Sequence, residues 1–176
     1  LYAGMAGEGI SNPFDRSLVG EYEQALVDWI ADETQSDPLT IHVGHGTCTK
    51  PKRSILPPLE RYAKLSVNGE ERLVGSVEAS HGCLHHCRHC PLPVIYDGRL
   101  RIVDVETVLS DIDQQVESGA QHITFGDPDF LNGPVHSLRI IRAMHEQHPN
   151  LTFDCTVKVE HILNHLDIWD EFARSG

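Results

Sequence analysis

The stretch of sequence that decides the fold is LVGSVEASHGCLHHCRHCP, residues 73–91. Its first part carries β-branched and apolar residues between small ones, and it predicts a strand over Arg72–Ala79. Its second part places Cys83, Cys87 and Cys90 in a C-x3-C-x2-C spacing. The chain has five cysteines, an odd number, and crowding three of them favours metal ligation in a reducing compartment over a disulfide framework. The stretch therefore joins a strand to a metal-binding loop.

The residues after this loop alternate between helical and extended patterns. The predicted elements are helices over 104–119 and 134–149, strands at 122–125 and 151–157, and a third helical stretch whose apolar residues are Ile162, Leu163, Leu166, Trp169 and Phe172. This alternation predicts an α/β fold of parallel strands joined by right-handed crossovers. In such folds the chemistry lies at the carboxyl ends of the strands, and the segments 80–96 and 126–133 both leave from that edge.

Upstream of the strand the patterns change. The apolar residues between Glu21 and Ala31 recur at helical spacing and predict an amphipathic helix. Glycine and proline dominate residues 40–62, which we interpret as a linker. Asn68-Gly69 predicts a hairpin turn before the strand. His42, His45 and Cys48 lie in the linker, and no role is assigned to them.

Composition excludes some functions. The chain of 176 residues has a formal net charge of −12 and no Lys/Arg stripe, which argues against nucleic acid as a partner. It has no apolar run of roughly 20 residues and no signal-peptide pattern, so no membrane partner and a cytoplasmic location are expected. Because the sequence begins at Leu1 and stops at Gly176, we expect a fragment of a longer protein.

Three chemistries fit the cysteine spacing. A four-iron, four-sulfur cluster held by three cysteines leaves one iron open for a small chelating molecule. A structural zinc ion can instead take the three thiolates and one of His85, His86 or His89, as a Cys3His set. A redox-active cysteine cluster without metal is the third alternative. The spacing alone leaves all three open.

The cysteine loop after a first strand, followed by alternating helices and strands, resembles the radical S-adenosylmethionine (SAM) superfamily. The resemblance implies that Cys83, Cys87 and Cys90 hold a 4Fe-4S cluster and that SAM chelates the open iron. It places His89 beside the adenine, where the family more often has an aromatic residue. The implied reaction is reductive cleavage of SAM to a 5'-deoxyadenosyl radical, with an electron donor such as flavodoxin or ferredoxin. The substrate, a small molecule or a peptide, stays open.

A second motif supports the same resemblance. Gly126, Asp127 and Pro128 resemble the family's Gly-Gly-Glu-Pro loop, which meets the methionine amino group of SAM, although Phe125 replaces the first glycine. A backbone carbonyl of this loop can make that contact, and an Asp-Pro turn that merely ends a strand is the alternative. Lys158 follows the third strand and is a candidate partner for the SAM carboxylate, or a solvated lysine.

Upstream segments resemble the junction in cobalamin-binding radical SAM proteins, and most of the chain resembles a group named for a CUAEP or CCAEP tail. This resemblance implies the N-terminal half of a partial (β/α)6 barrel, preceded by a helix and linker from a truncated Rossmann-like cobalamin-binding domain. The implied boundaries are a domain remnant at 1–35, a linker with a hairpin at 36–71 and a core of three β/α units at 72–176. Cobalamin is an open option for the intact protein. A non-catalytic, zinc-binding α/β module remains the alternative function.

Overall fold

The computed structural model describes residues 17–31, 39–42 and 48–176. The chain forms two compact units, which are treated separately: residues 1–47 with 82–101, and residues 48–81 with 102–176. The chain leaves and re-enters the second unit through β5 (Ser80–Gly82) and β6 (Leu100–Ile102), which pair as a two-stranded sheet. None of the helices in these described ranges has the length and apolarity that a bilayer-spanning segment requires.

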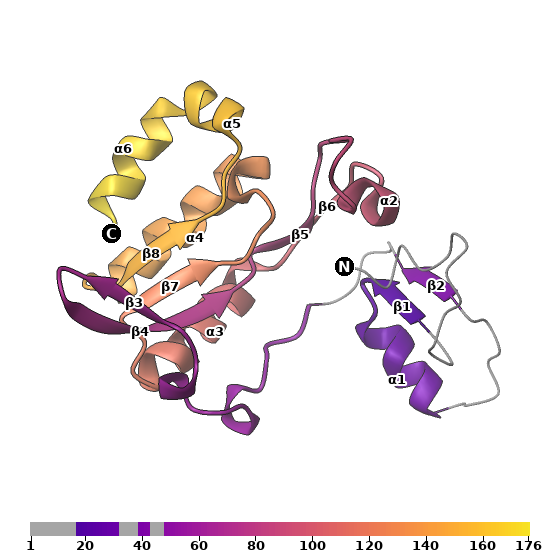
Figure 1. The fold of residues 1–176 in the computed structure, drawn as a ribbon, viewed down its shortest axis with the longest axis horizontal. Coiled ribbons are helices and arrows are strands. Elements are labelled where there is room, and N and C mark those ends of the chain that lie inside the picture. The colour runs from indigo at the N-terminus through magenta and orange to yellow at the C-terminus, as the bar shows by residue number, and fades with distance from the viewer. Residues whose placement is uncertain (1–16, 32–38, 43–47) are drawn as a thin grey trace. The chain divides into compact units, whose positions relative to one another are not determined.

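A four-stranded sheet organises the second unit (Figure 1). Its strands, in sheet order, are β3 (Lys64–Val67), β4 (Glu70–Val77), β7 (His122–Phe125) and β8 (Thr152–Cys155). The strands β4, β7 and β8 are parallel, and β3 pairs antiparallel with β4 through the predicted hairpin. At that turn Asn68 and Gly69 have φ of 53° and 87°, the left-handed values that this dipeptide adopts readily. The predicted parallel α/β core is confirmed.

Helices follow the parallel strands. They are α3 (Val105–Glu117), α4 (Pro134–Gln147), α5 (Val159–Asn164) and α6 (Leu166–Arg174). Asp104 caps α3 as predicted, because its side chain accepts a hydrogen bond of 3.0 Å from the Glu106 amide. The single helix expected after β8 is instead two, because the backbone of His165 leaves the helical region between α5 and α6.

The two faces of the sheet differ in polarity. Because neighbouring strands are in register, Val77, Phe125 and Cys155 lie on one face, which packs in the main core with buried residues of α3, α4 and α6. The members of this core that are at most 1% exposed are Ala79, Ile112, Ile123, Phe125, Leu131, Ile140, Ile141 and Met144. The other face presents polar side chains, among them His122, whose ring contacts Thr152 and Asp154 at 2.7 and 3.1 Å.

The first unit contains a parallel pair, β1 (Ser17–Gly20) and β2 (Leu39–His42), with α1 (Glu23–Ala31) between them in sequence. The linker prediction was wrong for 40–42, which belong to β2. A helix is present as predicted between Glu21 and Ala31, but α1 has no buried residue, and Ile30 is 68% exposed. Residues 1–16, 32–38 and 43–47, including His45, lie outside the described residues.

Candidate functional site

The cysteine motif lies in an irregular loop between β5 and α2 (Leu92–Tyr96) of the first unit. Cys83, Cys87 and Cys90 are all partly exposed, and none forms a disulfide. The amide of Cys90 donates a 3.1 Å hydrogen bond to the carbonyl of Cys87, which closes a turn between these two ligands. The loop therefore carries three partly exposed cysteines within eight residues.

Glycine fixes the course of this loop. Gly82, immediately before Cys83, has φ of +78°, and a Cβ atom placed there would lie 2.3 Å from the carbonyl oxygen of Arg99. Only glycine allows both the left-handed backbone and this close approach. After the loop, α2 buries Ile95 and Tyr96 against Val19 of β1. The cysteine loop is thus anchored at both ends.

Three thiolates suit an iron-sulfur cluster or, together with one histidine, a zinc ion. In a cluster each cysteine binds a different iron, so the three sulfur atoms are spaced widely. One zinc ion requires four donors around a single point, with Zn–S bonds of about 2.3 Å. Within the described residues, no group of ligand atoms that all lie within 4.8 Å of one another includes two of these thiols.

The predicted SAM loop is built around a buried carboxylate. Asp127 is 2% exposed, and its two oxygens accept hydrogen bonds from the Ala79 amide at 2.9 Å and the Ser80 hydroxyl at 2.6 Å. Burial raises the pKa of Asp127, and the hydrogen bonds from Ala79 and Ser80 oppose that rise. The side chain therefore points into the second unit and joins the end of β7 to the segment that follows β4.

The neighbours of Asp127 are arranged differently. Gly126 and Pro128 are exposed, and the Gly126 amide donates a 2.8 Å hydrogen bond to the carbonyl of Val77. The amine of Lys158 lies 2.6 Å from a carboxylate oxygen of Glu160, an exposed ion pair. The exposed part of this loop is thus its backbone at 126–128 and not the Asp127 side chain. This exposure is compatible with a contact through a backbone carbonyl, one of the alternatives given in the sequence analysis.

Sequence reasoning missed two residues beside Asp127. The carbonyl of Ala79 accepts hydrogen bonds from the Val103 amide at 3.0 Å and from Nε2 of His136 at 3.2 Å. Burial lowers the pKa of His136. His136 thus holds the Ala79 carbonyl, while Asp127 holds the Ala79 amide and the Ser80 hydroxyl. The position of Ser80 just before the cysteine loop was the only sequence signal for this role.

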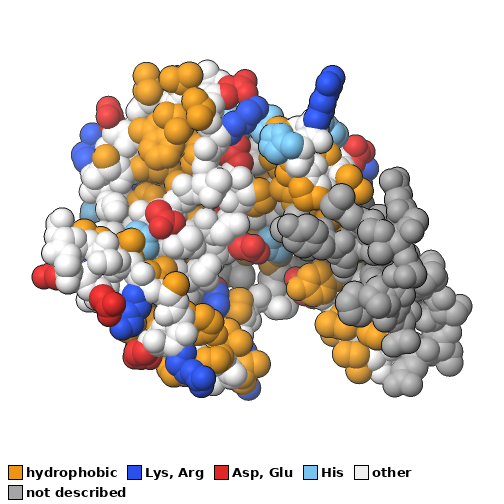
Figure 2. Space-filling model, in the orientation of Figure 1, with side chains coloured by type: hydrophobic (Ala, Val, Ile, Leu, Met, Phe, Trp, Pro, Cys, Tyr) orange, Lys and Arg blue, Asp and Glu red, His pale blue; other side chains and the backbone are white. Residues whose placement is uncertain are grey.

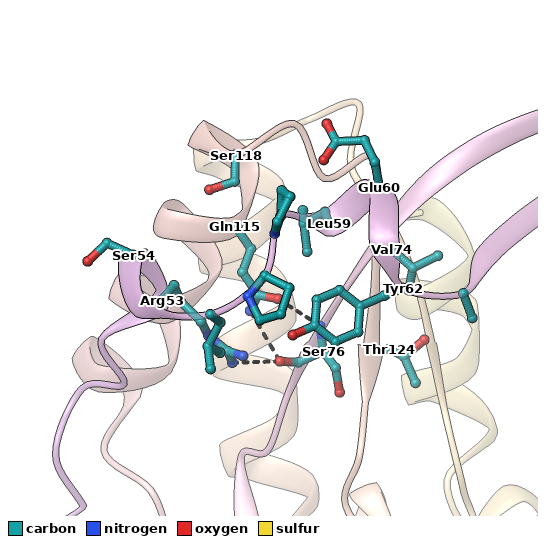
Figure 3. A pocket seen from close by; sticks show the side chains of 14 residues that line it. Arg53, Ser54, Leu59, Glu60, Tyr62, Val74, Ser76, Gln115, Ser118 and Thr124 are labelled. Carbon is teal, nitrogen blue, oxygen red and sulfur yellow. Dashed lines mark hydrogen bonds between the residues drawn. The ribbon is translucent and has the colours of Figure 1, made fainter.

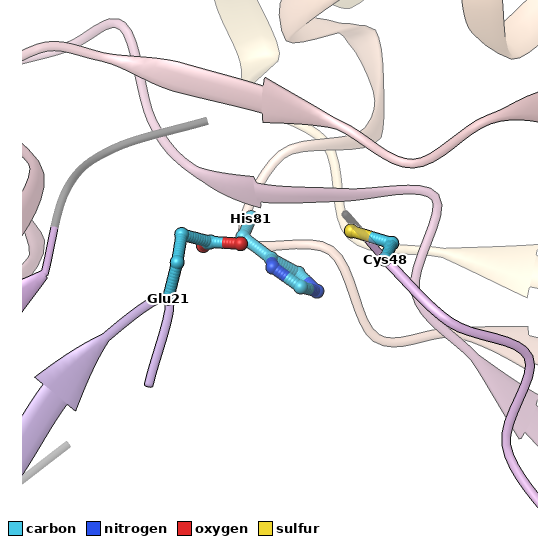
Figure 4. Close-up of side chains that lie close together, drawn as sticks. All are labelled: Glu21, Cys48 and His81. Atoms are coloured by element: carbon cyan, nitrogen blue, oxygen red, sulfur yellow. The ribbon is translucent and has the colours of Figure 1, made fainter. Parts of the chain in front are cut away.

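Other polar contacts lie elsewhere in the second unit. Cys48 Sγ and a ring nitrogen of His81 lie within 4.8 Å of each other (Figure 4), and His81 Nε2 lies 3.4 Å from Glu78 Oε2. Glu21, drawn in the same view, belongs to the first unit. In the second unit, Nε2 of His148 lies 2.7 Å from an oxygen of Asp113.

Comparison with known proteins places these motifs in context. The chain is 24% identical over 163 residues to hopanoid C-2 methylase from Rhodopseudomonas palustris (strain TIE-1), a match that covers 86% of this chain and 28% of the methylase. The chain thus spans about a quarter of the length of this curated relative. No protein-family model matches the chain.

Two solved structures of TsrM, a radical S-adenosylmethionine methyltransferase from Kitasatospora setae, are also similar. One, with cobalamin and a [4Fe-4S] cluster bound, has a TM-score of 0.40 and 20% identity, covering 45% of this chain and 16% of TsrM. The other, with tryptophan substrate and aza-SAM bound, has a TM-score of 0.40 and 16% identity, covering 59% and 22%. The relation to CUAEP or CCAEP proteins stays a prediction.

Proposed function

We propose that this chain is the cluster-binding part of a radical SAM enzyme. The observation that carries the proposal is the loop of three reduced, partly exposed cysteines that follows the first parallel strand and precedes further β/α units. Cys83, Cys87 and Cys90 would hold a 4Fe-4S cluster through their thiolates, and SAM would occupy the remaining iron. When bound, the cluster would supply the electron for homolytic cleavage of SAM.

The chain's own residues have separate tasks in this proposal. Gly82 and α2 set the course of the cysteine loop, which carries the three thiolates. The exposed backbone of Gly126 and Pro128 offers carbonyl acceptors for the SAM amino group, while the buried carboxylate of Asp127 holds this loop to the end of β4. His89 is exposed and available to pack against adenine. Lys158 would have to leave Glu160 to reach a carboxylate.

The reaction that follows SAM cleavage is proposed at class level only. The similarity to hopanoid C-2 methylase and to TsrM supports methyl transfer as the reaction class. Cobalamin is the cofactor that we propose for this reaction in the intact protein. The match covers about a quarter of the methylase. The substrate and the electron donor are therefore to be identified with the whole protein.

Product analysis tests the proposal. The chain is reconstituted anaerobically with iron and sulfide, reduced with dithionite in the presence of SAM, and assayed for 5'-deoxyadenosine by chromatography. We expect product from the reconstituted chain and none from Cys83→Ala. Tight zinc binding at about one ion per chain, with no iron retained, would contradict the proposal and favour the zinc-binding module.

A further inference from the structure

A cavity of about 680 Å³ lies in the second unit (Figure 3). One wall is the segment 53–63, here called the strap, which contains the short 3-10 helices η2 (Arg53–Ile55) and η3 (Leu59–Arg61). The other walls come from β4, β7 and the last turn of α3. The volume falls in the range of small-molecule sites, about 300–1,000 Å³.

The floor of the cavity is formed by the edge of β4, where a side chain of α3 takes the place of a neighbouring strand. Beyond Leu73, β4 has no β3 residue beside it, and Gln115 of α3 takes that place. The Gln115 side chain accepts a 2.8 Å hydrogen bond from the Ser76 amide and donates one of 3.2 Å to the Ser76 carbonyl. Arg53 donates to the same carbonyl at 2.7 Å. The floor is therefore rigid, and its backbone groups are already satisfied.

The cavity carries no uncompensated charge on its floor. The guanidinium of Arg53 forms a two-bond ion pair with Asp111, with distances of 2.7 and 2.5 Å, and this carboxylate holds the pKa of Arg53 above its usual value. The only other charged residue of the lining is Glu60, which is exposed. An anionic ligand would thus find no free cation there.

The strap wall is apolar and stiff. It contributes Leu56, Leu59 and the Pro57-Pro58 pair, whose rings restrict the backbone. Leu56 and Tyr62 are 47% and 48% exposed, although large apolar side chains are normally buried. Figure 2 shows apolar side chains reaching the surface of the molecule in several places. At the strap they line a cavity large enough for a small-molecule ligand.

Hydroxyl groups from three elements line the same cavity. Tyr62 follows η3, Ser76 lies on β4 and Thr124 lies on β7 (Figure 3). Ser76 and Thr124 are paired in the register of the two strands, so their side chains lie on the same face of the sheet. A ligand held between apolar walls can exchange hydrogen bonds with these hydroxyls.

We propose that this cavity binds a neutral, mostly apolar ring compound that carries a hydroxyl group. The stiff proline wall and the closed sheet edge suit a rigid ring, because neither side loses much conformational freedom on binding. The site goes beyond the proposed function. Ser76 and Thr124 precede the carboxyl ends of their strands, whereas Gly126 and Asp127 follow the end of β7.

Calorimetric titration of the metal-free chain with 2-naphthol tests the site independently of the cluster. We expect one molecule bound per chain, and at least about tenfold weaker binding of 2-naphthalenesulfonate, which has the same rings with an anionic group. Ala63→Trp, at an exposed lining position, should fill the cavity and reduce affinity by more than about tenfold. Tyr62→Phe should reduce the affinity for 2-naphthol by about two- to tenfold.

The control is Leu163→Ser, which removes a 67% exposed apolar side chain from α5 and should leave binding unchanged. Circular dichroism verifies that each variant folds. If Ala63→Trp does not fold, Ser76→Leu takes its place, because Ser76 is an exposed residue of the lining. Absence of 2-naphthol binding would overturn the proposal. So would equal affinity for the sulfonate, or equal losses from the cavity variants and Leu163→Ser.

Discussion

The two loops predicted to meet the cofactors are built in opposite ways. In the second unit, Asp127 is buried and its carboxylate is hydrogen-bonded to Ala79 and Ser80, so the loop is complete without a ligand. In the first unit, Cys83, Cys87 and Cys90 are partly exposed in an irregular loop, and none of them forms a disulfide. The difference separates a loop that the chain's own hydrogen bonds hold in place from a loop that, in the proposed function, becomes a site by binding the cluster.

The largest effect should come from removing one cysteine of the motif. Cys87→Ala should abolish the intact cluster, reducing iron from about four atoms per chain to below about one, because two thiolates cannot hold it. The free energy of unfolding of the metal-free chain should stay within about 0.5 kcal/mol of the wild type, since Cys87 is partly exposed. Iron analysis and urea denaturation measure both quantities. Cys155→Ala, outside the motif, is the control that should retain the cluster.

The opposite pattern is expected for Asp127. Asp127→Ala leaves the buried Ala79 amide and Ser80 hydroxyl without their acceptor, which should lower the free energy of unfolding by about 1–3 kcal/mol. Urea denaturation of the metal-free chain measures this change. Glu117→Ala, an exposed acidic residue at the end of α3, should change it by less than about 0.5 kcal/mol. Unchanged stability together with lost SAM binding would instead identify Asp127 as a direct SAM ligand.

Glycine at the beginning of the cysteine loop allows a smaller test. Gly82→Ala places a Cβ atom 2.3 Å from a backbone oxygen, in addition to the strain of a positive φ. Gly69→Ala has the same kind of strain, with φ of +87°, but no atom within 4 Å of the added Cβ. We expect Gly69→Ala to cost about 1–2 kcal/mol and to leave cluster loading unchanged. Gly82→Ala should also reduce the cluster content after reconstitution. Equal cluster loading in both variants would show that the backbone conformation at Gly82 does not affect cluster binding.

The smallest effect concerns pH. The pKa of His136 is lowered from 6.5 by burial, so between that pH and the folded value the unfolded chain binds more protons. The contribution of His136 to the free energy of unfolding therefore falls as the pH decreases through this window. Denaturation curves should be measured between about pH 7.5 and about pH 5, which brackets the usual histidine pKa. The free energy of unfolding should fall more steeply for the wild type than for His136→Gln. Parallel curves would assign the pH dependence to groups other than His136.

Much of the fold was predictable because local signals agreed with it. Asp104 lies at a helix start and Asn68-Gly69 at a hairpin, where their side-chain and backbone preferences are strong. The break at His165 and the strand β2 were missed, since neither has a distinctive residue pattern. Exposure of α1 was missed for a different reason. Periodicity identifies an apolar face but not whether another element covers it.

The sequence pointed directly to the candidate cluster ligands, but not to the residues that hold the neighbouring backbone in place. The spacing of the three cysteines is a local property, so the sequence contains it directly. Ser80 and His136 act through contacts with residues 47 and 57 positions away, and no local pattern records such pairs. The inward direction of Asp127 likewise depends on tertiary packing at the end of β7.

Electron paramagnetic resonance of the reconstituted chain tests the central claim most directly. The chain is loaded with iron and sulfide under anaerobic conditions, reduced, and measured before and after SAM is added. The account predicts a cluster signal that SAM perturbs, because three cysteines leave one iron free to bind it. A signal of the same shape with and without SAM, or the absence of any cluster signal, would contradict it.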